Sequence, residues 1–191
     1  MTALWSTLFT VSFASGLNIY ATILALGLLG RFHIVQLPGQ LDVLTSTPVL
    51  AGALLLYAIE FVADKIPYVD NVWDVIHSVI RPIGGAVLAY SAFGNLDRQW
   101  QVLAALVGGS VALTSHAAKA STRAAANLSP EPFSNWALSF GEDVMAVALV
   151  WLAALFPWIA LALVIVLIAL AIVIVIKFSR LVRRLRSRTA T

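Results

Sequence analysis

The sequence predicts an all-α integral membrane protein, and three observations carry that prediction. Hydrophobic residues make up 61% of the 191 residues and charged residues only 11%, a composition far from that of a soluble domain. The apolar stretches leave room for about six segments of roughly 20 residues, the length that crosses a bilayer. At the C-terminus, an apolar run from Trp158 to Ile176 is followed directly by KFSRLVRRLRSR, as at the cytoplasmic end of a spanning helix.

The chain divides into one membrane domain and a tail. Residues 1–176 contain no long polar stretch, so we expect a single transmembrane helical domain. Residues 177–191 form a basic tail, which we expect in the cytoplasm against anionic lipid headgroups. Nucleic acid is not an expected partner, because the tail follows a spanning helix and has little aromatic interleaving. The chain has no cysteine, which excludes disulfides and thiolate metal sites.

The first apolar stretch, residues 4–30, is predicted to remain as a membrane segment. It lacks a basic n-region and is too long for the core of a signal peptide. Small and polar residues at high density favour either a close helix–helix contact or a break in the helix. Within this stretch they are Ser12, Ser15, Gly16 and Asn18.

The second segment begins at Pro48, a residue suited to the first helical turn, and ends at Ile66. Glu60 lies well inside this segment, and Asp64 follows one turn later on the same face, beside Lys65. A charged group at the bilayer centre costs roughly 2.5 to 3.5 kcal/mol on insertion scales, so it is normally paired, neutral or in a wet cavity. We therefore expect these carboxylates to meet cations from later in the chain.

Residues 68–81 are predicted to form an amphipathic helix, because their apolar residues recur at helical spacing. Its other face carries one ionisable stripe, formed by Asp70, Asp74, His77 and Arg81. One interpretation of this stripe is a solvated interfacial face, and the other is part of a polar pathway. The following PIGG sequence, residues 82–85, predicts a broken or re-entrant helix, since few apolar residues remain to complete a crossing.

The second half of the chain resembles the first loosely, with charges of roughly opposite sign. A span from Trp100 to about Ala118 ends in a polar stripe, the next helix carries two carboxylates, and Pro157 opens the last span. The pattern is typical of a 3+3 pseudo-repeat with broken helices, and chance similarity between charged loops is the alternative. The ionisable residues of this half are His116, Lys119, Arg123, Glu142 and Asp143.

The basic residues also predict an orientation. With about six segments alternating across the bilayer, all lysines and arginines except Arg31 and Arg98 fall on the side of the C-terminal tail. Basic residues are enriched in cytoplasmic loops. Both termini are therefore expected in the cytoplasm.

The ionisable residues inside the predicted membrane segments are the candidate functional residues. We expect Glu60 and His116 to share one polar cluster, because a carboxylate beside a histidine can hold or release a proton near neutral pH. The candidates for a pathway or substrate-binding role are Asn18, Glu60, Asp64, Lys65, Asp74, His77, Arg81, His116, Lys119, Arg123, Glu142 and Asp143.

Other site chemistries have less support in the sequence. Asp70, Asp74 and His77 share a helix face and are suited to a hard cation, but an ion-pair network would use the same residues. No GxSxG, HExxH or GxxxxGK[ST] motif occurs, and Ser115-His116 forms no recognised nucleophile elbow. We predict no enzymatic activity, no catalytic residues and no cofactor, and metal binding stays open.

Three stretches carry a resemblance to a known family: SGLNIYATILALGLLGRF, EFVADKIPYVDNVWDVIHSVIRP, and SHAAKASTR with SPEPFSNW. Over residues 12–156 the chain resembles a widespread family of small polytopic bacterial membrane proteins, labelled only as a domain of unknown function. The resemblance implies a bacterial inner-membrane location. It implies no substrate, reaction or site residue, because the family has none assigned.

Two classes of function are compatible with these features. The first is a small transporter or channel for an ion or small solute, proton-coupled through the intramembrane ionisable residues. The second is a structural or assembly protein whose buried charges only lock the helices together. Because a bundle this small can hardly enclose a hydrated pathway alone, we also predict a homo-oligomer, most simply a dimer.

Overall fold

The computed structural model describes residues 2–66, 69–126 and 132–189, and all regular structure in them is helical. Four helices are long and apolar enough to cross a membrane: α4, α5, the Trp136–Leu155 part of α6, and the Pro157–Arg184 part of α7. These features confirm the predicted all-α membrane fold class. The elements in chain order are α1 (Thr2–Leu17), α2 (Ile19–Arg31), a short 3-10 helix η1 (Leu41–Thr45), α3 (Thr47–Ala63), α4 (Val69–Ala92), α5 (Arg98–Ala126), α6 (Pro132–Leu155) and α7 (Pro157–Thr189).

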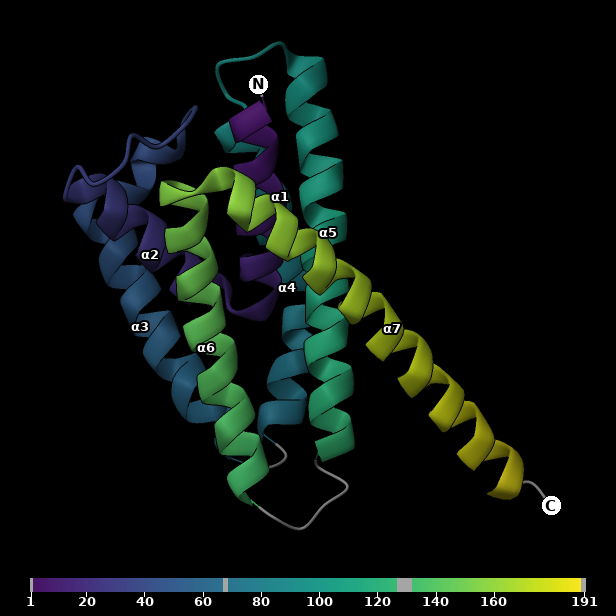
Figure 1. Cartoon of the computed structure of the whole chain (residues 1–191). Coiled ribbons are helices and arrows are strands. Elements are labelled where there is room, and N and C mark those ends of the chain that lie inside the picture. The colour runs from purple at the N-terminus through teal and green to yellow at the C-terminus, as the bar shows by residue number, and fades with distance from the viewer. Residues whose placement is uncertain (1, 67–68, 127–131, 190–191) are drawn as a thin grey trace.

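The first apolar stretch is a re-entrant hairpin rather than a spanning helix. α1 has 16 residues and α2 has 13, and both are shorter than a span of about 20 residues. α1 runs into the bundle from the end where the N-terminus lies, and α2 returns to the same end (Figure 1). Asn18 makes the break, because its backbone is extended (φ −152°, ψ 106°) and its side chain caps α2 at the Ala21 amide.

The helix break and the close contact predicted for this stretch are both present. The break lies at Asn18, and the contact lies at Gly16, two residues earlier. A Cβ atom on Gly16 would collide with the Ala112 carbonyl and the Ser115 hydroxyl of α5. Glycine therefore allows the end of α1 to lie directly against α5.

The break predicted at residues 82–85 is absent. α4 is one continuous helix from Val69 to Ala92 with Pro82 inside it. The nearby glycines serve close packing instead, because a Cβ atom on Gly85 would lie 2.5 Å from the Ala112 Cβ and 3.2 Å from the Gly108 carbonyl oxygen. α4 packs along α5 at this point, and tertiary contact holds the helix together across the proline.

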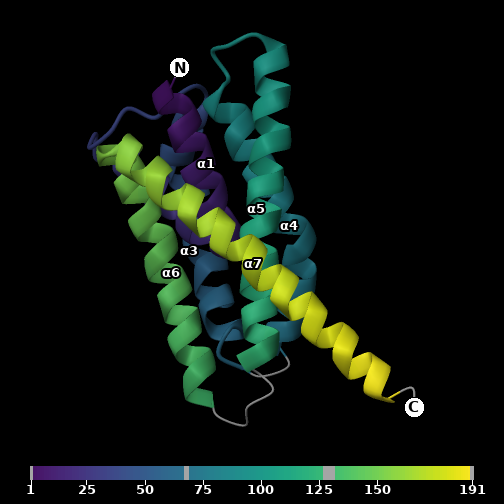
Figure 2. The same ribbon diagram turned by 45° about the vertical axis from the view of Figure 1, so that its right-hand side comes forward.

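The two ends of the described chain lie at opposite ends of the bundle (Figures 1 and 2), and the side of the membrane that each faces stays a prediction. The hairpin returns to its starting end, and α3 to α7 then run alternately along the bundle. Of these helices, α3 has 17 residues and is shorter than the four that are long and apolar enough to cross a membrane. Arg31 and Arg98 lie at the end that holds the N-terminus, and α7 carries the basic tail toward the other end.

α1 occupies the middle of the bundle, in contact with α2, α4, α5, α6 and α7. Its buried apolar residues, such as Leu8 and Phe13, join the core cluster with Leu88, Phe93 and Val164. By contrast, large apolar side chains cover the outside of the bundle, among them Leu55, Val75, Leu106 and Ile165. Apolar residues outside and charged residues inside suit a bundle surrounded by hydrocarbon.

Candidate functional site

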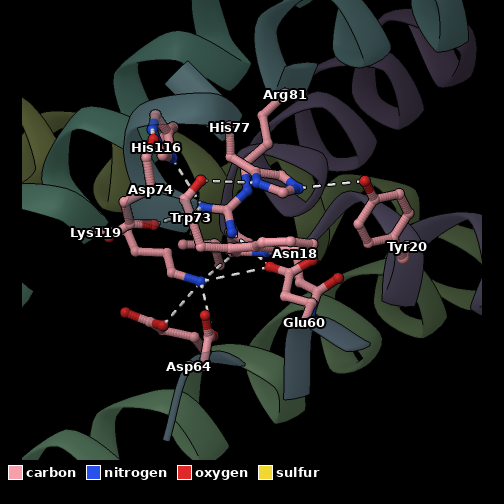
Figure 3. Close-up of polar contacts among 12 residues, drawn as sticks. Asn18, Tyr20, Glu60, Asp64, Trp73, Asp74, His77, Arg81, His116 and Lys119 are labelled. Carbon is pink, nitrogen blue, oxygen red and sulfur yellow. Dashed lines mark hydrogen bonds and ion pairs between the residues drawn. The ribbon is translucent and has the colours of Figure 1, made fainter. Parts of the chain in front are cut away.

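The ionisable residues predicted from sequence gather inside the bundle, around the tip of the α1–α2 hairpin (Figure 3). Arg81 lies at the middle of α4 and Asp143 at the middle of α6, whereas Asp70 in the first turn of α4 and Arg123 in the last turn of α5 lie nearer one end of the bundle. We call this group the charge cluster. Its members are Asn18, Glu60, Asp64, Asp70, Asp74, Arg81, His116, Lys119, Arg123, Glu142 and Asp143.

Arg81 connects α4 to α3 and α5. Its Nη2 donates to Glu60 Oε1 at 2.5 Å, and its Nη1 lies 2.8 Å from His116 Nδ1 (Figure 3). Nη1 also lies 3.8 Å from Asp74 Oδ1, in a loose ion pair within α4. All four side chains are buried, where the low dielectric strengthens such interactions. We call these four residues the Arg81 network.

The contacts of His116 determine its tautomer. A guanidinium can only donate, so the Nδ1 atom that faces Arg81 accepts and carries no proton. The ring proton lies on Nε2, which donates to the Asp74 carbonyl oxygen at 3.2 Å and lies 3.1 Å from the Ser78 hydroxyl. His116 is therefore neutral while Arg81 occupies Nδ1. Glu60 and His116 share one cluster, as predicted, but Arg81 lies between them.

Arg123 is the second buried arginine, and all three of its nitrogens donate to carboxylates. Nη2 donates to Asp64 at 2.7 Å and to Glu142 at 2.6 Å, Nε donates to Glu142 at 3.1 Å, and Nη1 donates to Asp70. These bonds tie the last turns of α5 to α4, α6 and the C-cap of α3. We call Arg123, Asp64, Asp70 and Glu142 the Arg123 network.

Lys119 lies between the two networks. Its ammonium is 3.4 Å from Asp64 and 3.2 Å from Glu142 on one side, and 3.7 Å from Glu60 on the other. It also donates to the Leu17 carbonyl at 3.1 Å. This one cation therefore couples both arginine networks to the hairpin tip.

The broken helix contributes its own ends to the site. The Gly16 and Leu17 carbonyls at the end of α1 accept from Arg81 at 3.4 Å and from Lys119 at 3.1 Å. The last carbonyls of a helix have no partner within it and carry partial negative charge, which suits a cation. Breaking the helix at Asn18 thus places a backbone cation site in the middle of the bundle.

Asp143 differs from the other cluster carboxylates in its partners. Its Oδ1 accepts from Asn18 Nδ2 at 2.8 Å, and its Oδ2 accepts from the Tyr57 hydroxyl at 3.3 Å. Within the described ranges, no lysine or arginine forms an ion pair with it. Asp143 is therefore a buried carboxylate held by neutral donors.

The cluster contains more acids than bases. Among the residues that the structure describes, its carboxylates are Glu60, Asp64, Asp70, Asp74, Glu142 and Asp143, and its cations are Arg81, Lys119 and Arg123. Three buried carboxylate oxygens have no hydrogen-bond partner, namely Glu60 Oε2, Asp64 Oδ1 and Asp74 Oδ1, and Arg81 Nε has none either. Unpaired buried charge is costly, so these oxygens favour the uptake of a proton or a cation.

Lys65 and His77 lie at the edge of the site. The Lys65 ammonium donates to the Phe61 carbonyl at 3.0 Å and lies over the Phe61 ring, and partial burial lowers its pKa. His77 Nδ1 donates to the Trp73 carbonyl at 2.9 Å, and its Nε2 lies 3.2 Å from the Tyr20 hydroxyl (Figure 3). Neither residue forms an ion pair within the described parts of the chain.

The stripe of α4 faces the interior, which corrects its interpretation as a solvated face. Asp70, Asp74, His77 and Arg81 are all buried, while the apolar residues of α4 such as Val75 face outward. The described residues hold no group of three or more His, Asp or Glu arranged to bind a metal ion. Asp70 was not among the predicted pathway candidates, although its place on the stripe of α4 could have indicated it. Nothing in the sequence marked Tyr20, Tyr57 or Ser78.

A comparison with protein families covers nearly the whole chain. The chain belongs to the DUF4126 family. The family, described as a domain of unknown function, matches residues 6–177, which include every member of the charge cluster. Neither the curated proteins nor the solved structures contain a match to this chain. The resemblance found in the sequence is confirmed, and it adds no assigned activity.

Proposed function

We propose that this protein is a small transporter or channel in a bacterial inner membrane, which moves a cation or small solute with proton coupling. The observation that carries the proposal is the excess of buried carboxylates around a helix break, with unbonded oxygens on Glu60 and Asp74 beside Arg81. Intramembrane ionisable residues of this kind are typical of ion pathways and proton relays. Helices broken near the midplane are typical of transporter binding sites.

Glu60 is the proton acceptor in this proposal, and His116 is not. Arg81 occupies the free nitrogen of His116, whereas Glu60 Oε2 is buried without a partner. A proton on Glu60 would weaken its pair with Arg81 and leave Arg81 to the second carboxylate within reach, Asp74 at 3.8 Å. Asp64 and Lys119 also face Glu60, so they would share in the response. The movement of Arg81 between two carboxylates is the coupling step.

The orientation follows from the positions of the basic residues. Lys65, Lys119, Arg123 and the tail lie toward one end of the bundle, and we infer that this end faces the cytoplasm. The N-terminus then lies on the opposite side. We also propose that residues 177–191 bind anionic lipid headgroups and that the protein works as a homodimer. A C-terminal reporter should read cytoplasmic, and an N-terminal one periplasmic.

Proton flux into vesicles tests the proposal. The purified protein is reconstituted into liposomes with a trapped pH dye, and a potassium diffusion potential drives protons inward. We expect flux above that of empty liposomes, loss of this flux in Glu60→Gln, and unchanged flux in the exposed control Arg98→Met. Equal flux in wild type and Glu60→Gln, or none in wild type, would overturn the proposal.

One observation favours the structural alternative, in which the charges only hold the helices together. Arg123 donates to three carboxylates from different elements, as a fixed lock would require. A lock tolerates joint replacement of its charges by apolar residues of similar volume, whereas a pathway loses transport and keeps its fold. The structural reading predicts folded protein and no proton flux in every variant, wild type included.

A further inference from the structure

An apolar cavity of about 330 Å³ lies among α2, α3 and α6. Its lining includes Leu24, Leu28, Phe32, Tyr57, Val147 and Trp151. Leu28, Phe32 and Trp151 are substantially exposed, so the mouth of the cavity lies on the apolar outer surface of the bundle. A volume of this size is typical of small-molecule sites, which combine an apolar body with a few polar groups.

Among the described lining residues, Tyr57 carries the one hydroxyl, and this hydroxyl contacts the charge cluster. The Tyr57 hydroxyl donates to Asp143 Oδ2 at 3.3 Å, and Asn18 at the hairpin tip holds the other oxygen. Asp143 is also the cluster carboxylate without an ion pair in the described ranges. An apolar cavity thus ends at a phenol backed by a buried carboxylate that lacks a cation.

We propose that this cavity binds a lipophilic amine, with its apolar body against α2 and Trp151 and its ammonium at the Tyr57 hydroxyl, which Asp143 backs from outside the lining. An ammonium there can donate to the Tyr57 oxygen and brings a positive charge near Asp143, which forms no ion pair with a lysine or arginine in the described ranges. The aromatic rings of Tyr57 and Trp151 also favour a cation near their faces. A fatty acid of the same size is disfavoured, because its carboxylate would meet that of Asp143.

This inference rests on the proposed function in one respect: it names the substrate class that the proton-coupled site would move. Because Asp143 and the Arg81 network meet at the hairpin tip through Asn18 and the Gly16 carbonyl, amine binding and Glu60 protonation would act on one element. Binding itself requires no proton gradient. It can therefore be measured separately from flux.

Equilibrium dialysis of radiolabelled phenylbutylamine and phenylbutanol against protein in nanodiscs tests the site, with empty nanodiscs subtracted. The two probes match in size and differ in charge. We expect the amine to bind about tenfold or more tightly than the alcohol, since a tenfold ratio is a modest share of a buried charge pair. Asp143→Asn should remove this preference without changing alcohol binding, and Tyr57→Phe should weaken it if Asp143→Asn fails to fold.

Filling the cavity provides the geometric control. Val147→Trp should abolish binding of both probes, because Val147 lines the cavity. Leu163→Trp is the matched variant, since Leu163 lines a separate apolar hollow of about 280 Å³ between α6 and α7, and it should leave binding unchanged. Equal binding of amine and alcohol, or equal effects of the two tryptophan variants, would overturn the amine site.

Measurements of amine binding and of proton flux together distinguish a failure of the amine site from a failure of the proposed proton pathway. Glu60→Gln should still bind the amine, because the Tyr57 hydroxyl in the cavity lining bonds to Asp143 and not to Glu60. Flux without amine binding would reject the amine site and keep the proton pathway. Amine binding with flux unchanged in Glu60→Gln would keep the site and reject the proton pathway.

Discussion

Arg81 and Arg123 are both fully buried in neighbouring helices, yet the carboxylates around them are satisfied to different degrees. Arg123 uses all three nitrogens on three carboxylates. Arg81 uses two nitrogens, of which one reaches a carboxylate, and its Nε has no partner. Two unbonded carboxylate oxygens, on Glu60 and Asp74, belong to the Arg81 network, whereas one, Asp64 Oδ1, belongs to the Arg123 network.

The difference teaches that one cluster can perform two tasks. A fully paired guanidinium gains nothing by moving, so the Arg123 network holds α3, α4, α5 and α6 together at one end. The Arg81 network has a second carboxylate within reach and empty acceptor positions, so a proton can change its pairing. The predictions below test this division, from the largest expected effect to the smallest.

Arg123→Met should destabilise the protein most. It removes the guanidinium that pairs with Asp64, Asp70 and Glu142, and leaves Lys119 as the cation beside Asp64 and Glu142. Removing one partner of a buried ion pair costs about 3–5 kcal/mol. Unfolding in mixed detergent should show a loss of that size, whereas Arg98→Met, at an exposed position, should change the unfolding free energy little. If Arg123→Met were as stable as wild type, the Arg123 network would not be what holds these helices together.

Asn18→Ala should have an intermediate effect, since it removes both the cap of α2 and the donor to Asp143. Loss of an N-cap alone costs about 0.5–2 kcal/mol. Asn18→Asp keeps the N-cap but places a second carboxylate against Asp143. We therefore expect it to keep the stability that the cap provides and still be less stable than wild type. If Asn18→Asp were as stable as wild type, the hydrogen bond between Asn18 and Asp143 would not contribute to the free energy of unfolding.

Joint replacement of Glu60 and Arg81 by methionine should change stability little. Apolar residues of similar volume can replace a buried ion pair at little or no cost. The double change removes one acid and one base together, and the other pairs it breaks, Arg81–Asp74 at 3.8 Å and Lys119–Glu60 at 3.7 Å, are loose. The unfolding free energy should stay near that of wild type while proton flux is lost. A large loss of stability in this double variant, comparable to that of Arg123→Met, would show that both arginines are locks.

His116→Gln should have the smallest effect. A glutamine can accept from Arg81 with its oxygen and donate to the Asp74 carbonyl with its amide, as the neutral histidine does. We expect proton flux within about twofold of wild type across the pH range, since a factor of two is under 0.5 kcal/mol. Loss of flux in His116→Gln would make the histidine the proton carrier instead of Glu60.

Much of the cluster could be predicted from sequence because its physics is local. The stripe of α4 follows from helical spacing, and the pairing of Glu60 and Asp64 with later cations follows from the cost of charge in hydrocarbon. Composition and the apolar segments likewise predicted the all-α membrane fold.

The hairpin and the continuity of α4 depend on tertiary contacts, which no local sequence pattern predicts. The apolar stretch at residues 4–30 looked like one span, yet the partners of Gly16 and Asn18 on α5 and α6 hold it as a hairpin. Pro82 predicted a break, yet packing against α5 keeps α4 continuous. The return of α2 to the end of the bundle that holds the N-terminus follows from the hairpin alone. The 3+3 pseudo-repeat, the dimer and the tail's lipid contacts stay predictions.

The most direct test of the division between the two networks is pH-difference infrared spectroscopy of the protein in lipid vesicles. A carboxylate that takes up a proton gains a carboxylic acid band that an amide cannot produce. The account predicts that acidification of the wild type produces such a band, that Glu60→Gln removes it, and that Glu142→Gln, in the Arg123 network, leaves it in place. A band that persists in Glu60→Gln and disappears in Glu142→Gln would show that the proton binds in the Arg123 network, and would contradict the proposed division.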